Sequence, residues 1–278
     1  MQQKEFSWKT KDGMNIFAKE WTPDGKVKAA IALVHGLGEH IDRYEHVAKA
    51  FTDAGFAMTG YDLRGHGKSD GIRGFSNSND AMMDDITQNI QIVKEHFPNV
   101  PTFLYGHSLG GNLVLYYTLT RKPDIKGVIA TSPGLGVAKP LPAALNVAMN
   151  ILYKLAPATK INNTLDVTGL SRDPEVVKKY TSDPLVHPFV SPRLAKDMFL
   201  NGDYCLAHAG EFPLPLLLMQ GTADRLVNPA KTKAFALAAP LSKVTYKEYE
   251  GYYHELHNEP EKVEILKVMV GWIDQELK

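Results

Sequence analysis

Several features that would place a protein in a particular class are missing from this sequence. Cys205 is the only cysteine among 278 residues, which excludes an internal disulfide and fits a reducing compartment. Lysine and arginine together number 31, as do aspartate and glutamate, so the formal net charge is zero. Without an excess of positive charge there is no long-range attraction to a nucleic acid, and we expect no nucleic-acid partner.

The sequence also lacks long hydrophobic runs. None is long enough to cross a bilayer, and the first residues, MQQKEFSWKTKDG, lack the apolar core of a signal peptide. We therefore expect a soluble, cytoplasmic protein. The histidines at 35, 40, 66 and 107 follow no metal-ligand spacing, and no cofactor motif is present, so we predict neither a metal nor a cofactor.

Short apolar runs of strand length alternate with helical patterns over most of the chain. A Lys11-Asp12-Gly13 turn joins two strand patterns within 4–23, which we expect at an antiparallel edge. Strands that alternate with helices predict an α/β fold, in which helices cover both faces of a parallel sheet. Reactive groups in such sheets gather at the carboxyl ends of the strands. The later strand-length runs are 29–34, 56–61, 103–105, 125–131, 214–220 and 244–250.

The alternation of strands and helices stops in one interval. Residues 137–210 are rich in proline and helical in pattern. We therefore predict an α/β core formed by residues 1–136 and 211–278, with residues 137–210 inserted as a mainly helical cap.

One helix of this insert has an unusual pattern. Asn146, Asn150 and Lys154 recur at every fourth position, which gives an otherwise apolar helix one narrow polar stripe. Such a helix either packs against the core or forms a cap that lines an acyl channel and rests on a membrane surface. The sequence leaves both interpretations open.

The clearest chemical motif is Gly106-His107-Ser108-Leu109-Gly110, between an apolar run and a helical pattern that begins at Asn112. A turn this tight brings backbone against backbone unless its flanking positions lack a Cβ, and the two glycines leave Ser108 on a strained corner. The Leu109 N–H, at the start of the helix, can donate to an oxygen that becomes negative during attack. The motif predicts Ser108 as a nucleophile.

A serine hydroxyl needs an imidazole that accepts its proton and a carboxylate that orients the imidazole. Asp224 lies in the loop at the carboxyl end of a strand-length run, where it can reach the same edge of the sheet. Asp197 and Asp203, in the insert, are the weaker alternatives. We predict Asp224 as the orienting acid.

Two histidines follow the last strand pattern. His254 is nearer the strand end, whereas His257 is next to the start of the closing helix and fits a position at the rim. The order Ser, Asp, His is the one expected of α/β hydrolases, which favours His254 as the base. The His35-Gly36-Leu37 turn can supply the Leu37 N–H as a second donor to the oxyanion.

These motifs resemble one known family. The segments HGLGEHIDRY, YDLRGHGKSDG, GHSLGG, GTADRLV and EGYYHELHNE, with SRDPEVVKKYTSDPL in the insert, are similar to those of the monoacylglycerol lipases. These are serine hydrolases of the α/β-hydrolase fold, and the resemblance spans nearly the whole chain. It implies a mostly parallel eight-stranded sheet with a helical cap. It also implies that Ser108, Asp224 and His254 are catalytic and that Leu37 and Leu109 supply the oxyanion amides.

The resemblance implies a substrate as well. It suggests that Glu39, Arg43 and His257 meet the glycerol end of a monoacylglycerol. The ester of this substrate would be cleaved through an acyl-enzyme. The cap would contact a membrane surface transiently. A carboxylesterase, lysophospholipase or thioesterase with the same triad is the alternative within the enzymes. A noncatalytic binding module is the alternative outside them. A peptidase is disfavoured, because the cap offers no evident carboxylate cluster for a free amino terminus.

Overall fold

A sheet of eight strands forms the centre of the protein. The computed structural model describes residues 1–138 and 142–278, apart from the side chains of residues 143 and 146. The strand order is β1-β2-β4-β3-β5-β6-β9-β10. As predicted, β1 and β2 pair antiparallel at one edge, and the other six strands are parallel to one another. The strands are β1 Gln2–Lys9, β2 Asn15–Thr22, β3 Ala29–Val34, β4 Phe56–Tyr61, β5 Thr102–His107, β6 Gly127–Thr131, β9 Leu216–Gly221 and β10 Val244–Tyr249.

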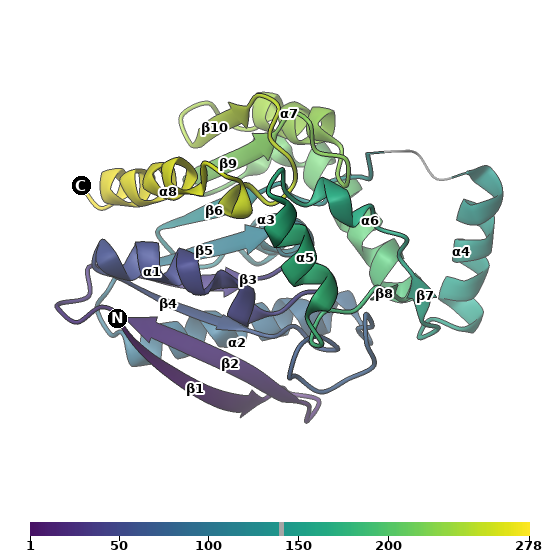
Figure 1. Cartoon of the computed structure of the whole chain (residues 1–278), viewed down its shortest axis with the longest axis horizontal. Helices are drawn as coiled ribbons and strands as arrows, with labels where there is room; N and C mark the ends of the chain where they lie inside the picture. The colour runs from purple at the N-terminus through teal and green to yellow at the C-terminus, as the bar shows by residue number, and fades with distance from the viewer. Residues whose placement is uncertain (139–141) are drawn as a thin grey trace.

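Helices cover both faces of the sheet (Figure 1). Buried side chains of α1 and α8 join one hydrophobic cluster, and those of α2, α3 and α7 join the other. This is the layering of an α/β-hydrolase fold. The bounds are η1 Ile41–Tyr44, α1 Glu45–Asp53, α2 Asn79–His96, α3 Leu109–Arg121, α7 Pro229–Ala238, η4 Leu256–Asn258 and α8 Lys262–Glu276.

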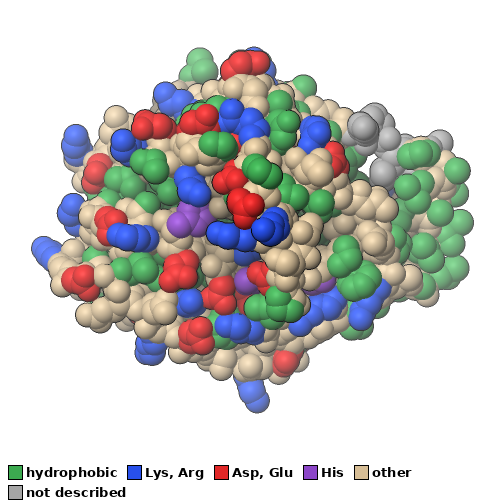
Figure 2. Space-filling view, viewed as in Figure 1, with side chains coloured by type: hydrophobic (Ala, Val, Ile, Leu, Met, Phe, Trp, Pro, Cys, Tyr) green, Lys and Arg blue, Asp and Glu red, His purple; other side chains and the backbone are tan. Residues whose placement is uncertain are grey.

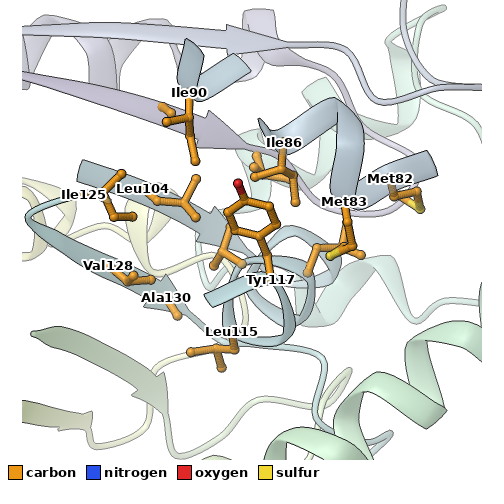
Figure 3. Packing of buried hydrophobic residues seen from close by; sticks show 14 of the residues in the cluster. Met82, Met83, Ile86, Ile90, Leu104, Leu115, Tyr117, Ile125, Val128 and Ala130 are labelled. Carbon is orange, nitrogen blue, oxygen red and sulfur yellow. The ribbon is translucent and has the colours of Figure 1, made fainter. Parts of the chain in front are cut away.

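The central strands β3, β4, β5, β6 and β9 are buried along their whole length because both of their faces are covered. On β3, Ile31 and Leu33 face the cluster of α1 and α8, whereas Ala32 and Val34 face that of α2 and α3. Figure 3 shows the second cluster, with strand residues packed against side chains of α2 and Tyr117 of α3. The strands are therefore fixed from both sides, and the loops at their carboxyl ends have a rigid base.

The described residues of the segment 137–210 lie beside the carboxyl ends of the central strands, with α4 at the outer edge (Figure 1). Leu194 and Cys205 of α6 belong to the same cluster as α3 and the sheet, so this part of the segment is anchored in the main core. No described helix is both long and apolar enough to cross a membrane. The elements are α4 Ala143–Leu155, β7 Ile161–Asn162, η2 Val167–Gly169, α5 Pro174–Ser182, β8 Phe189–Val190, α6 Pro192–Ala207 and η3 Ala209–Glu211.

Candidate active site

Ser108 sits in a strained turn between β5 and α3. Its φ of 54° is in the left-handed region, which a side chain other than glycine rarely adopts. A Cβ added at Gly106 would lie 2.3 Å from the Gly110 carbonyl oxygen, and one added at Gly110 would lie 2.0 Å from that of Val34. Both glycines of the motif are therefore required by close backbone contact, and Ser108 is half-buried at the N-terminus of α3.

Asp224 and His254 meet at this serine. The distance from His254 Nε2 to Ser108 Oγ is 2.8 Å, and that from His254 Nδ1 to Asp224 Oδ2 is 2.7 Å. Asp224 is buried, and its Oδ1 accepts hydrogen bonds from the backbone N–H groups of Leu226 and Val227. The structure thus brings the three predicted residues together in the geometry of a catalytic triad. Neither alternative acid contacts His254: Asp197 accepts a hydrogen bond from Tyr153, and Asp203 faces Lys231.

The acid and the imidazole shift each other's pKa. Burial raises the pKa of Asp224, but the neighbouring His254 and the hydrogen bonds to its carboxylate outweigh this and leave the pKa below its usual value. Burial lowers the pKa of His254, but the charge of Asp224 and the hydrogen bond to it outweigh burial and leave the pKa raised above 6.5. The imidazole is therefore a stronger base than an unperturbed histidine.

The raised pKa of His254 predicts the pH dependence of hydrolysis. A general base works only in its neutral form, so kcat/KM should rise with pH and reach half its plateau above pH 6.5, the usual value for histidine. A series of kcat/KM measurements from pH 5 to pH 9, with a substrate that has no ionisable group, reads this midpoint directly. A midpoint clearly below pH 6.5 would contradict the coupling to Asp224.

Two backbone segments can supply oxyanion donors. Leu37 and Leu109 both line the cavity beside Ser108. Leu109 is the first residue of α3, so its N–H has no partner one turn earlier in the helix. A Cβ added at Gly36 would lie 3.3 Å from Ser108 Cβ, so the turn that carries Leu37 passes directly beside the serine. Both predicted oxyanion residues therefore lie beside the nucleophile.

A buried ion cluster holds that turn. Glu39 accepts hydrogen bonds from the Gly36 N–H at 2.6 Å and from the Tyr44 hydroxyl at 2.7 Å, and it pairs with Arg43. Arg43 also makes a bidentate ion pair with Glu255, in which Nη1 and Nη2 lie 2.8 and 2.7 Å from the two carboxylate oxygens. Burial raises the pKa of Glu39; at Glu255 the guanidinium outweighs burial and holds the pKa well below its usual range. The cluster ties the Leu37 turn to the residue after His254.

The cavity at Ser108 has a volume of about 240 Å³ and mostly apolar walls. At what we call its polar end, the wall residues Glu39, Tyr180 and Glu255 gather around Arg43. Asn162, Asn163 and Thr164 add further polar groups to the wall. Of the residues predicted to meet glycerol, only Glu39 lines the cavity. Arg43 lies behind Glu39, and His257 is fully buried, so the structure does not bring these two to the cavity wall. The apolar lining includes Leu145, Met149, Val190, Met198, Phe199, Leu226 and Val227.

Sequence reasoning missed Glu255 and Tyr180 as lining residues. The position of Glu255, directly after the proposed base, was a signal that could have found it. Tyr180 comes from α5 in the insert, and its ring centre lies 4.8 Å from the Arg43 guanidinium carbon. No pattern in the sequence predicts that this helix reaches the cluster.

Helix α4, which carries the predicted polar stripe, faces both the cavity and the outside of the molecule. Leu145 and Met149 line the cavity, although Leu145 is also partly open to solvent, and Val147, Ile151 and Leu155 are exposed without lining it. Asn150 and Lys154 of the predicted stripe are exposed, and the Asn146 side chain lies outside the described residues. The helix is therefore not simply buried against the core.

Comparison with known proteins agrees with this geometry. The family described as serine aminopeptidase, S33, matches residues 25–261. The monoacylglycerol lipase of Mycolicibacterium smegmatis is 33% identical over 97% of this chain and 96% of its own length. The crystal structure of the Paleococcus ferrophilus monoacylglycerol lipase superimposes with a TM-score of 0.87 at 34% identity, over 94% of this chain and 99% of that one.

One relative is much longer than this chain. An uncharacterized abhydrolase domain-containing protein of Dictyostelium discoideum is 37% identical over 97% of the chain, which spans 29% of that protein's length. The two lipases, by contrast, are matched over nearly their whole length.

The chain is a carboxylic ester hydrolase with lipase or esterase activity, and it belongs to the monoacylglycerol lipase family of α/β-hydrolase-fold serine hydrolases.

Proposed function

We propose that this protein cleaves the ester bond of monoacylglycerols, giving a fatty acid and glycerol through an acyl-enzyme on Ser108. One observation carries the proposal: the Ser108 hydroxyl, 2.8 Å from His254 Nε2, lies at a cavity with mostly apolar walls and a polar end at Glu39 and Glu255. The apolar walls suit an acyl chain and the polar end suits an alcohol. An amphiphile with a single chain fits both.

The proposed reaction follows from these positions. Ser108 Oγ attacks the ester carbonyl while its proton passes to His254 Nε2, and Asp224 holds the imidazolium through Nδ1–H. The N–H groups of Leu37 and Leu109 donate hydrogen bonds to the carbonyl oxygen as it becomes negative. The imidazolium returns the proton to the leaving glycerol oxygen. A water molecule, deprotonated by the same imidazole, then releases the fatty acid and restores the serine.

The charges at the polar end favour an uncharged alcohol. Two carboxylates, Glu39 and Glu255, line it, and no Lys or Arg is among the described residues of the cavity wall. A phosphate group binds best to charge-assisted donors from Arg or Lys, so the phosphate of a lysophospholipid lacks a partner here. We propose that Glu39 contacts glycerol hydroxyls, and that Arg43 and His257 support this end from behind.

The same charges disfavour an aminopeptidase. A free amino terminus needs an available carboxylate, but both lining carboxylates are already bound to the Arg43 guanidinium. An ammonium group would have to displace a buried ion pair in order to bind. We therefore place the activity with esters rather than with peptides.

We further propose that residues 137–210 form a cap over the cavity and that α4 contacts a membrane surface from the cytoplasmic side. Figure 2 shows hydrophobic side chains gathered at the edge of the molecule where α4 lies. Ile151 is 52% exposed and Leu155 80%, which is costly in water but favourable at a lipid surface, at about 0.8 kcal/mol for each buried methylene. This contact would bring the cavity to the lipid that carries its substrate.

A comparison of substrates tests the proposed function. We expect kcat/KM for a long-chain monoacylglycerol to exceed that for glycerol monoacetate by more than about tenfold, since burial of only two methylenes gives that factor. Diacylglycerols and lysophospholipids of the same chain length should be poorer substrates, because the polar end accommodates neither a second chain nor a phosphate. A preference for water-soluble acetate esters, or for the lysophospholipid, would contradict the proposal.

A variant of α4 separates the surface contact from the chemistry. Ile151→Asp should slow hydrolysis of monoacylglycerol presented in phosphatidylcholine vesicles by about tenfold, the loss expected for one large apolar side chain, and leave a soluble butyrate ester unaffected. Leu237→Asp is the matched control, because Leu237 is also exposed but lies on α7. Equal effects of the two variants would exclude α4 as the contact.

A further inference from the structure

One stretch of the inserted segment contacts both loops that carry the proposed acid and base. This stretch, residues 166–172, comprises η2 and the turn before α5, and we call it the strap. On the acid side, Arg225 follows Asp224 directly, and its Nη2 donates to Thr168 Oγ1 at 2.8 Å. A Cβ added at Gly169 would lie 2.7 Å from Leu226 Cδ1, so the strap backbone lies flush against the acid loop.

The strap also hydrogen-bonds the backbone of His254. The His254 N–H donates to the Gly169 carbonyl at 3.3 Å, and the Glu255 N–H donates to the Leu170 carbonyl at 2.7 Å. From the core, Ser132 Oγ donates to the His254 carbonyl at 2.7 Å. The core and the strap thus both hold the histidine backbone.

Two side chains at the end of the strap fix the rest of the histidine loop. Ser171 Oγ donates to the Asn258 carbonyl at 2.9 Å, and Arg172 Nε donates to the carboxylate of Glu259 at 2.8 Å. Glu259 is fully buried, and its other oxygen accepts the Tyr253 N–H at 2.7 Å. Arg172 therefore reaches the residue before His254 through a single carboxylate.

We propose that the strap sets the position of the His254 imidazole relative to Ser108 and Asp224, with Arg172 as its chief positioning residue. The inference rests on the proposed triad and adds a role for the insert beyond covering the substrate. Arg172 does not line the cavity at Ser108, so it acts through the histidine loop. A misplacement of about 1 Å in a catalytic group can cost a factor of about 100 in rate.

Arg172→Gln tests the strap. We expect kcat for a p-nitrophenyl ester to fall by between about tenfold and about a hundredfold, with KM little changed. The fall in kcat should be the same for butyrate and laurate esters. Labelling of Ser108 by a fluorophosphonate should slow in parallel. The midpoint of kcat/KM against pH should move down toward 6.5, because a looser His254–Asp224 bond raises the imidazole pKa less. Arg172→Lys, which keeps a charge for Glu259, should restore part of the activity.

The matched control is Arg121→Gln. Arg121 pairs with Asp80 and Asp84 at the end of α3, and its side chain is 41% exposed against 31% for Arg172. This control should keep the wild-type kcat and pH midpoint. Ser171→Ala is measured beside it. This variant removes the bond to the Asn258 carbonyl and the bond that Ser171 Oγ accepts from the Asp173 N–H, and it should show a smaller fall that keeps the same pattern.

Several results would contradict the proposed role of the strap. The first is a kcat for Arg172→Gln equal to that of Arg121→Gln. The second is a fall in kcat that is confined to esters with long acyl chains. Where Arg172→Gln does not fold, wild-type kinetics in both Ser171→Ala and Arg172→Lys would contradict the proposed role. The proposed function fails separately: wild-type protein that neither hydrolyses monoacylglycerol nor reacts with the fluorophosphonate contradicts the triad itself.

Discussion

Ser108→Ala is expected to lower kcat by about six orders of magnitude, the loss seen when the nucleophile of subtilisin is removed. The reason is the single hydroxyl at 2.8 Å from His254 Nε2, which no other oxygen of the site replaces as a nucleophile. The oxyanion donors and the cavity remain in the variant, so a small residual rate above the uncatalysed reaction should persist. KM should change little, because the walls that bind the acyl chain are untouched.

The measurement combines kinetics with covalent labelling. A fluorophosphonate probe should label the wild type at one serine and leave Ser108→Ala unlabelled, while the melting temperature of the variant stays close to that of the wild type. Ser7→Ala, at an exposed position on β1, is the control and should behave as the wild type. Labelling of Ser108→Ala at another serine would show that the nucleophile lies elsewhere.

The nucleophile turn could be predicted because its causes are local. Strand, glycine, serine and glycine follow one another within a few residues, and the structure confirms that both glycines are required by backbone contacts. The predicted start of the helix was wrong: α3 begins at Leu109, not at Asn112. Glycine is a poor helix former, which favoured a loop at Gly110 and Gly111. Close contacts decide these positions instead: Gly110 lies against the Val34 carbonyl and Gly111 against Pro133.

The partners of Ser108 could be predicted only as candidates. The rule that reactive groups lie at the carboxyl ends of strands favoured Asp224 and His254, and the sheet order places β5, β6, β9 and β10 side by side, so their loops meet. Strand order is not written in the local pattern, because it depends on pairings between distant segments. The family resemblance supplied what the pattern could not.

The groups that hold the site could not be predicted from sequence. Arg43 and Glu255 are 212 positions apart, yet they form a buried ion pair beside the cavity. Arg172 and Glu259 are 87 positions apart and look like ordinary surface charges in the sequence. The first contact depends on how distant strands are ordered in the sheet, and the second on where the insert lies over the core; neither periodicity nor turn chemistry specifies either.

His254→Ala should reduce kcat about as severely as the loss of the serine, by about 10⁶ if the histidine of subtilisin is a guide. The imidazole touches both Ser108 and Asp224, at 2.8 and 2.7 Å, so its removal leaves the hydroxyl without a proton acceptor. Fluorophosphonate labelling should also become slow, because the same proton must leave the serine. Binding of a substrate analogue should remain, since the apolar walls of the cavity are intact.

His257→Ala should cost far less activity, because the position of His257 fits packing and not proton transfer. Its ring is fully buried and stacks on Tyr44 at a centroid distance of 4.8 Å. Burial lowers the pKa of His257 well below 6.5, so this imidazole is a poor proton acceptor at neutral pH. His257→Phe, which keeps a ring against Tyr44, is the control for packing and should retain kcat within about tenfold, since it leaves the proton path untouched. If His257→Phe instead lost about 10⁶ in kcat while His254→Ala stayed active, His257 would be the base.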